Sequence, residues 1–246
     1  MPNSRTGVIA LIPARGGSRG IPRKNISELC HRPLISWTIE SAFQSGVFDE
    51  VWVSTDDEEI ARVSREWGAS VHRRDPETAT DSASTESAMF DFLKHHASEI
   101  ICLIQATSPL TLSTHFSEGL KKFRESCADS LVTVTRNHLF LWSDEGKPLN
   151  YDPAQRPRRQ EWNGVLTENG AFYFTKVTVF AETRNRLGGR TVVYEMPQEY
   201  SVDIDSMDDL ALCELAMKKR LAIGSPVAAS VGSRCHMASV REPSLK

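Results

Sequence analysis

The patterned part of the chain begins with an apolar stretch, Val8–Pro13, that runs directly into a glycine-rich, basic loop. The stretch has the continuous apolar character of a buried parallel strand, which Pro13 ends. Glycine lets backbone N–H groups approach anionic oxygens closely, while Arg and Lys add charged donors. The loop residues that supply these donors are Arg15, Gly16, Gly17, Ser18, Arg19, Gly20, Lys24 and Asn25. We therefore expect a triphosphate-sized anion site where the first strand ends.

This loop matches neither of the common glycine-rich nucleotide motifs. No Gly-Lys-Ser or Gly-Lys-Thr follows at the spacing of a P-loop, and the dinucleotide pattern G-x-G-x-x-G is absent. On this stretch alone, an ordinary turn competes with phosphate binding. The blocks further along the chain decide between the two.

Apolar strands alternate with amphipathic helices through most of the chain. Strands are expected at 51–54, 70–72, 99–104, 130–135 and 192–194, and helices at 33–46, from 55 to 67, near 89–93, near 116–123 and at 207–220. This alternation is typical of an α/β fold with an open, doubly wound, mostly parallel sheet. A chain of 246 residues with 40% hydrophobic residues can bury the core of one such domain with an insertion.

Composition excludes several classes of protein. The net charge of −3 argues against a surface that coats nucleic acid. No apolar run reaches membrane-spanning length and the first seven residues are polar, so we expect an intracellular protein without a membrane segment. The five cysteines are odd in number and form no C-x-x-C pair, which predicts neither a disulfide framework nor a zinc site.

Two aspartates near the end of the patterned region suggest a metal site. Asp203 and Asp205 are one residue apart, so on an extended segment their carboxylates share a face. Like charges so close repel each other unless a cation lies between them, and Mg²⁺ accepts one or two carboxylates together with phosphate oxygens and water. Capping of the following helix, for which Ser206 and Asp208 are also available, is the alternative.

A third aspartate, Asp56, gives a weaker indication of a functional role. It follows the strand at 51–54 and belongs to a capping-box pattern at 55–58, so helix capping is its simpler role. Its place at the carboxyl end of a strand also directs it toward any crevice at that edge of the sheet.

The loop resembles the signature of a known family. Leu11–Gly20, followed by Lys24 and Asn25, is similar to the signature of the sugar-activating cytidylyltransferases, most closely the CMP-sialic acid synthetases. The resemblance covers roughly residues 8–220, and Arg19 stands where members usually carry Lys. It implies a Rossmann-like nucleotidyltransferase fold in a domain at 1–221. Residues 222–246 are rich in Ala, Ser, Gly and Pro, and we expect them to form a disordered tail.

The resemblance also implies which residues recognise the substrates. A cytosine-reading segment maps onto Arg74, Ala79, Thr80, Asp81 and Ser82, and the polar block after the strand at 99–104 makes Gln105 the leading sugar contact. Two aromatic residues, Phe172 and Tyr173, correspond to residues that lie against the sugar. Both belong to an aromatic strand that we expect to follow a turn at 168–170.

Regular periodicity fails between about 136 and 169, a segment too long for a passive connection. It resembles the family's dimerisation arm, which reaches into the neighbouring subunit. We therefore expect a homodimer, or a dimer of dimers, in which Arg158 or Arg159 meets a substrate carboxylate across the interface. The basic cluster at Arg156–Arg159 also has the form of a nuclear import signal, so the nucleus and the cytoplasm are both expected compartments.

The activity implied is transfer of CMP from CTP to the anomeric hydroxyl of a sialic acid, with Mg²⁺, Mn²⁺ or another divalent ion. Arg15, Arg19, Lys24 and Asp205 are expected to act in catalysis, and Asp203 and Asp205 to bind the metal. No histidine lies in a recognised motif, so Asp205 and a metal-activated hydroxyl are both open as the general base. A cytidylyltransferase for another acidic sugar such as Kdo, and a non-catalytic homologue that binds nucleotide sugars, are the alternatives.

Overall fold

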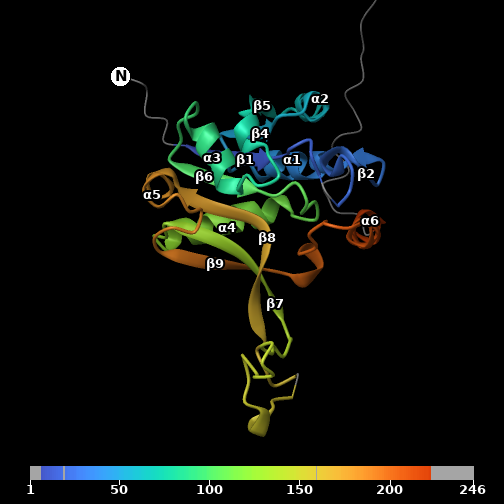
Figure 1. The fold of residues 1–246 in the computed structure, drawn as a ribbon, viewed down its shortest axis with the longest axis vertical. Helices are drawn as coiled ribbons and strands as arrows, with labels where there is room; N and C mark the ends of the chain where they lie inside the picture. Colours follow the sequence, from blue (N-terminus) through green and yellow to red (C-terminus); the bar gives the residue numbers. More distant parts are fainter. Residues whose placement is uncertain (1–6, 19, 159, 223–246) are drawn as a thin grey trace, which may run out of the picture.

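The computed structural model describes residues 7–18, 20–158 and 160–222. Arg19, Arg159 and the expected tail from 223 onward lie outside the described residues. The described strands form a seven-stranded sheet in the order β5-β4-β1-β6-β8-β7-β9, beside a small hairpin of β2 and β3 (Figure 1). Their bounds are β1 Val8–Pro13, β2 Glu28–Leu29, β3 Arg32–Pro33, β4 Glu50–Thr55, β5 Ser70–Arg73, β6 Ile100–Ile104, β7 Ser130–Asn137, β8 Val165–Lys176 and β9 Thr191–Met196.

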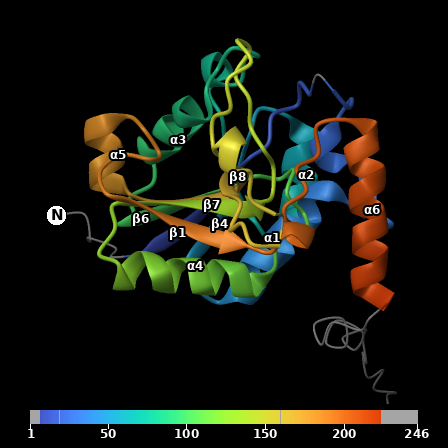
Figure 2. The same ribbon diagram turned by 90° about the horizontal axis from the view of Figure 1, so that it is seen from below.

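Helices cover both faces of this sheet. Their bounds are α1 Leu34–Ser45, α2 Glu58–Glu66, α3 Thr85–Leu93, α4 Ser113–Glu125, α5 Val177–Thr183 and α6 Met207–Ala222. Residues of α1, α2 and α4 pack into the core on one face, whereas α3 and α5 pack on the other. Figure 2 shows α4 below the sheet, α3 above it and α6 at its side. The predicted doubly wound α/β fold is therefore confirmed.

Strand direction places the loops that matter at one edge. Strands β1, β4, β5 and β6 run parallel, while β8 is antiparallel to its neighbours β6 and β7. The carboxyl ends of the four parallel strands therefore lie side by side. In an open α/β sheet this is the edge at which ligands bind.

Two local expectations were wrong. The expected turn at 168–170 lies inside the continuous strand β8, where Gly170 has φ +71° and the register with β7 shifts between Val132 and Val134. Glu-Asn-Gly suits a bulge as well as a turn, because both need a residue with positive φ. Helix α5 was missed because β-branched residues such as Val177 and Val179 have low helix propensity. Burial of Phe180, which is 1% exposed, stabilises α5 instead.

The segment expected to form an arm does project from the body. Strands β7 and β8 continue beyond the sheet core, and residues 138–164 between them form the distal part (Figure 1). Aromatic rings hold it together: Phe140 stacks on Trp162 with 4.7 Å between ring centroids, and the Arg156 guanidinium lies 4.4 Å from the Phe140 ring. Leu139, Leu141, Trp142 and Leu149 are exposed there. Dimerisation through this arm stays a prediction.

None of the helices in the described ranges is both long enough and apolar enough to span a lipid bilayer.

Candidate active site

The glycine-rich loop is anchored to the turn that follows β4. Ala14 N donates to Ser54 O at 2.9 Å, and Gly16 N donates to Asp56 Oδ1 at 3.0 Å. From the other side, Asn25 Nδ2 donates to Arg15 O at 3.1 Å. The loop therefore has a defined shape before any ligand binds, which lowers the entropic cost of binding.

Asp56 does not cap α2. Asp57 accepts from both Glu59 N and Ile60 N at 2.9 Å, whereas Asp56 turns toward the glycine loop. The cap lies one residue later than expected because β4 extends to Thr55, whose hydroxyl accepts from Asp57 N at 3.1 Å.

A cavity of about 360 Å³ opens beside this loop at the carboxyl edge of the sheet. We call it the first cavity. It brings together predicted nucleotide residues from the loop after β1, the base segment and the last loop, and also Gln105 after β6, which was predicted to contact the sugar. Its lining includes Arg15, Ser18, Lys24, Asn25, Arg74, Asp81, Gln105 and Asp205.

Lys24 joins the two ends of the chain. Its Nζ donates to Ile204 O at 2.6 Å and to Asp205 Oδ1 at 3.0 Å. Its side chain is only 14% exposed, whereas that of Asp205 is 79% exposed, so solvent screens this ion pair from the Asp205 side. Gly20 lies against the same segment, where an added Cβ would come within 2.2 Å of Asp205 O. The loop and the aspartate segment thus lie against each other, and their common role in binding stays a prediction.

The segment that carries the two aspartates is held in place because Ile204 between them is fully buried and donates its N–H to Thr107 O at 3.0 Å. Asp203 has an exposed surface, yet crowding by protein atoms raises the pKa of its carboxyl group, and the negative charge of Asp205 adds to this effect. A hydrogen bond from Thr107 acts in the opposite direction. Protonation of one carboxylate or a bound cation would relieve this repulsion.

These residues fit a Mg²⁺ ion that shares its coordination with substrate. In the described ranges, no group of three or more His, Cys, Asp or Glu side chains is arranged to hold a metal alone. Mg²⁺ needs only one or two carboxylates when phosphate oxygens and waters complete its octahedron. Asp203 and Asp205 offer that donor set beside the first cavity.

The base segment is tied to the phosphate loop by Arg15. Arg15 Nη1 donates to Thr80 O at 2.8 Å and lies 2.9 Å from Asp81 Oδ1. Arg74 is buried and donates to Ser54 O at 2.8 Å and to Ser54 Oγ at 3.2 Å; burial lowers its pKa. Ala79, Thr80 and Ser82 follow in the same segment without lining the first cavity. Their part in base recognition stays a prediction.

A second cavity of about 710 Å³ lies on the other side of the aspartate segment. Asp203 lines it, whereas Asp205 lines the first cavity, so residues 203–205 separate the two. Among the described residues, the buried Thr135 hydroxyl has no hydrogen-bond partner. The remaining lining includes hydroxyl and amide groups from Asn137, Thr167, Asn169, Gln198 and Ser201, together with the carboxylate of Glu168.

The sequence reasoning did not identify the second cavity. Its residues come from the extensions of β7 and β8 and from the loop after β9, far apart in sequence. The alternation of Thr135 with Asn137 could have marked one polar face of β7. The pairing of that strand with 165–168 could not be read from the chain.

Phe172 and Tyr173 do not line either cavity. Phe172 is fully buried against Phe116, with 4.9 Å between ring centroids, and Tyr173 is 2% exposed in the core on the opposite face. The prediction that both rings touch a sugar is wrong for this arrangement, because helices cover both faces of β8. Tyr173 instead donates its hydroxyl to Glu168, which lines the second cavity.

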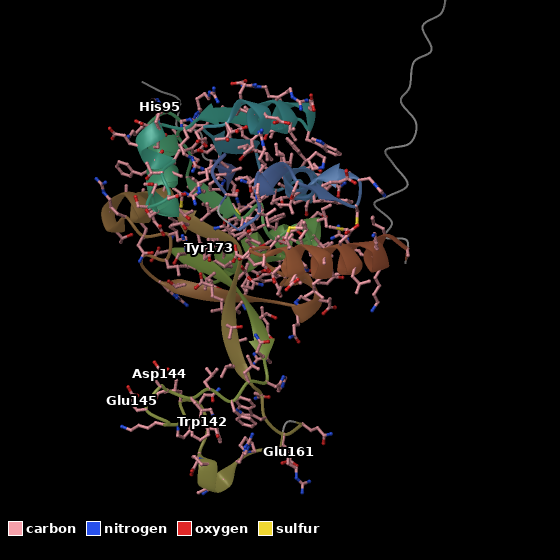
Figure 3. The ribbon with its side chains drawn as sticks, turned by 45° about the vertical axis from the view of Figure 1, so that its right-hand side comes forward. His95, Trp142, Asp144, Glu145, Glu161 and Tyr173 are labelled. Atoms are coloured by element: carbon pink, nitrogen blue, oxygen red, sulfur yellow. The ribbon has the colours of Figure 1, made fainter. Side chains whose placement is uncertain are left out.

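Arg158 lies on the arm, away from both cavities of its own chain. Its side chain is 83% exposed and pairs only loosely with Glu161 at 3.9 Å. Figure 3 places Glu161 at the far end of the arm, well away from Tyr173 in the body. Arg158 therefore lines neither cavity of its own chain.

A glycine-rich basic loop and paired aspartates meet at the carboxyl edge of a doubly wound sheet, the edge at which open α/β proteins bind their ligands. The fold agrees with a solved structure, CMP:2-keto-3-deoxy-manno-octonic acid synthetase in complex with CTP, with a TM-score of 0.69 at 17% identity over 87% of this chain and all of that one. The cytidylyltransferase family model matches residues 9–222. The chain belongs to the cytidylyltransferase family.

Curated relatives lie within the same family. N-acylneuraminate cytidylyltransferase A of Danio rerio is 46% identical over 215 residues, which cover 84% of this chain and 50% of that protein. Pseudaminic acid cytidylyltransferase of Campylobacter jejuni is 30% identical over 222 residues, covering 85% of this chain and 96% of that protein. The chain spans about half the length of the N-acylneuraminate cytidylyltransferases that it matches.

The contact between Gly20 and Asp205 predicts the effect of an added methyl group. In Gly20→Ala the Cβ would collide with Asp205 O, so the loop must move away from the aspartates. We expect CTP affinity, measured by calorimetry, to fall by about tenfold or more. Gly17→Ala has no described atom within 4 Å of its Cβ and should change the affinity by less than about threefold. Equal losses in both variants would contradict the proposed contact.

Proposed function

We propose that this chain transfers CMP from CTP to the anomeric hydroxyl of N-acetylneuraminate, giving CMP-sialic acid and pyrophosphate. The observation that carries the proposal is the Lys24–Asp205 contact, which joins a triphosphate-sized basic loop to a metal-binding pair. Identity of 46% to an N-acylneuraminate cytidylyltransferase supports the choice of sugar. The second cavity, with its hydroxyl and amide lining, suits a polyhydroxylated acid.

In this reaction the anomeric oxygen bonds to the α-phosphorus of CTP, the bond from that phosphorus to the bridging oxygen of the β-phosphate breaks, and pyrophosphate leaves. Negative charge grows on the α-phosphoryl group and on the pyrophosphate, and Arg15 and Lys24 line the cavity in which it develops. We assign the same role to Arg19. Asn25 and Gln105 orient the substrates.

Asp203 and Asp205 would hold a Mg²⁺ or Mn²⁺ ion, which would neutralise phosphate charge when bound. Since they lie between the two cavities, they also lie between the sites that we assign to nucleotide and sugar. The proton of the attacking hydroxyl passes to Asp205; a bound metal ion would supply the alternative by lowering the pKa of that hydroxyl.

The exposed apolar arm supports a homodimer, or a dimer of such dimers, in which Arg158 and Arg159 reach the substrate carboxylate of the partner subunit. The basic cluster at Arg156–Arg159 could also serve as a nuclear import signal. Arg156 already stacks on Phe140, whereas the exposed Arg158 of this cluster is available to bind a substrate or a partner protein.

A related candidate is a cytidylyltransferase for another acidic sugar. The 30% identity to a pseudaminic acid cytidylyltransferase, over nearly the whole of that protein, favours keeping it. One assay separates the candidates: the chain is incubated with CTP, Mg²⁺ and N-acetylneuraminate, and pyrophosphate and CMP-sugar are measured. UTP, ATP and Kdo serve as controls. Absence of product with any divalent metal would contradict an enzyme, and product with Kdo alone would support the alternative.

The metal role predicts a separation between activity and stability. We expect Asp203→Asn and Asp205→Asn each to lower turnover by about 100-fold or more, because each removes a ligand charge. The free energy of unfolding, measured with urea, should change by less than about 1 kcal/mol because both side chains have exposed surface.

Asp208→Asn is the matched control, since Asp208 is an exposed aspartate in the first turn of α6. It should keep wild-type turnover. A variant of Asp203 or Asp205 that unfolds at lower urea concentration but keeps full turnover when folded would contradict the assignment of these residues as metal ligands.

The shared site predicts complementation between two impaired subunits. Arg158→Ala and Asp205→Asn should each show little turnover as separate proteins. Co-expressed, they should recover about one quarter of wild-type activity, because half of the dimers are mixed and each mixed dimer has one intact site. Lack of recovery in a preparation shown to contain mixed dimers would exclude a contribution of Arg158 across the interface.

A further inference from the structure

Residues 54–57, the last two of β4 and the two that turn into α2, contact both loops that we assign to the nucleotide. Ser54 O accepts from Ala14 N of the phosphate loop at 2.9 Å and from Arg74 Nη2 at 2.8 Å. Arg74 opens the base segment. This segment is therefore the common support of the phosphate-binding and base-binding parts of the first cavity.

Asp56 makes the second pair of contacts from this segment. Its carboxylate accepts from Gly16 N at 3.0 Å, and its backbone carbonyl accepts from Arg73 Nη1 at 3.3 Å. The charge of Asp56 also favours the cationic form of Arg74, against the burial that lowers the pKa of that guanidinium. One exposed carboxylate thus acts on the phosphate loop and on the base segment together.

Helix capping does not explain this carboxylate. Asp57 satisfies the first N–H groups of α2 and also pairs with Arg23 at 3.1 Å. A further negative charge next to a cavity for a polyanion opposes binding through Coulomb repulsion. Its hydrogen bond also occupies a loop N–H that could otherwise bind phosphate. A compensating role in the site is therefore required.

We propose that Asp56 is a positioning residue of the nucleotide site, which holds the Gly16 N–H and thereby sets the loop that presents Arg15 and Ser18 to the triphosphate. This inference rests on the proposed function, because the triphosphate is taken to bind in the first cavity. Asp56 touches neither the sugar cavity nor the aspartate pair. Replacing Asp56 should accordingly change the binding of CTP and leave the binding of the sugar unchanged.

The test is a comparison of KM values. In Asp56→Ala, we expect the KM for CTP to rise about tenfold, the loss typical of one charge-assisted hydrogen bond. The KM for N-acetylneuraminate and the urea midpoint should stay at wild-type values. Asp56→Asn keeps an oxygen that can accept from Gly16 N and should lie within about threefold of wild type.

Asp129→Ala is the matched control. Asp129 is a half-buried carboxylate that also accepts a backbone N–H, from Arg190 at 2.9 Å, and pairs with Lys176 at 2.9 Å, but it precedes β7 at the opposite edge of the sheet. This variant should leave the KM for CTP unchanged. An unchanged or lower KM for CTP in Asp56→Ala, or equal rises in the KM values for CTP and sugar, would overturn the inference.

A binding measurement keeps this test separate from the proposed function. If the wild-type chain shows no turnover with any sugar, the proposed function fails. Calorimetric titration with CTP then still compares wild type with Asp56→Ala. A tenfold weaker binding would support the positioning role, whereas equal affinity or lack of CTP binding to either protein would refute it.

Discussion

The contact of the Lys24 ammonium group with Ile204 O and Asp205 Oδ1 closes the site. It spans 181 positions in sequence and joins the first strand–loop unit to the segment before the last helix. Burial of Ile204 on one side and the close approach of Gly20 on the other fix this segment. Because one cation neutralises one of two adjacent carboxylates, the site can carry paired acidic groups next to a loop built for phosphate.

Charge in the first cavity is arranged in matched pairs. Arg15 faces Asp81, Lys24 faces Asp205, and Asp56 supports Arg74. A preorganised set of dipoles and charges loses little free energy to reorganisation when a ligand enters. The pairing also explains why the net charge says little about this site: Arg15 and Lys24 act locally, each within hydrogen-bond distance of an acidic side chain.

The aspartate segment divides the site into two cavities of different chemistry. The first is lined by Arg, Lys and backbone donors, the second by hydroxyl and amide groups around the unpartnered Thr135 hydroxyl. A transfer reaction needs its two substrates on either side of the group that moves. The geometry provides this separation with three consecutive residues, 203–205. Since the arm carries Arg158 away from both cavities, completing the sugar site falls in our proposal to a second subunit.

The α/β class and most of the strands and helices could be predicted from the amino-acid sequence, because hydrophobic periodicity is a local signal. The principal residues of the first cavity could be predicted too, because a glycine-rich anion loop is also a local pattern. The sequence located Lys24 and Asp205 but could not show their contact, which depends on the packing of α6. The folded structure was needed to show that Phe172 and Tyr173 are core residues, because helices cover both faces of β8. It was also needed to show that Asp56 accepts a hydrogen bond from the phosphate loop while Asp57 caps α2. The second cavity arises solely from strand pairing between β7 and β8 and from the loop after β9, long-range contacts for which a single sequence carries no periodic signal.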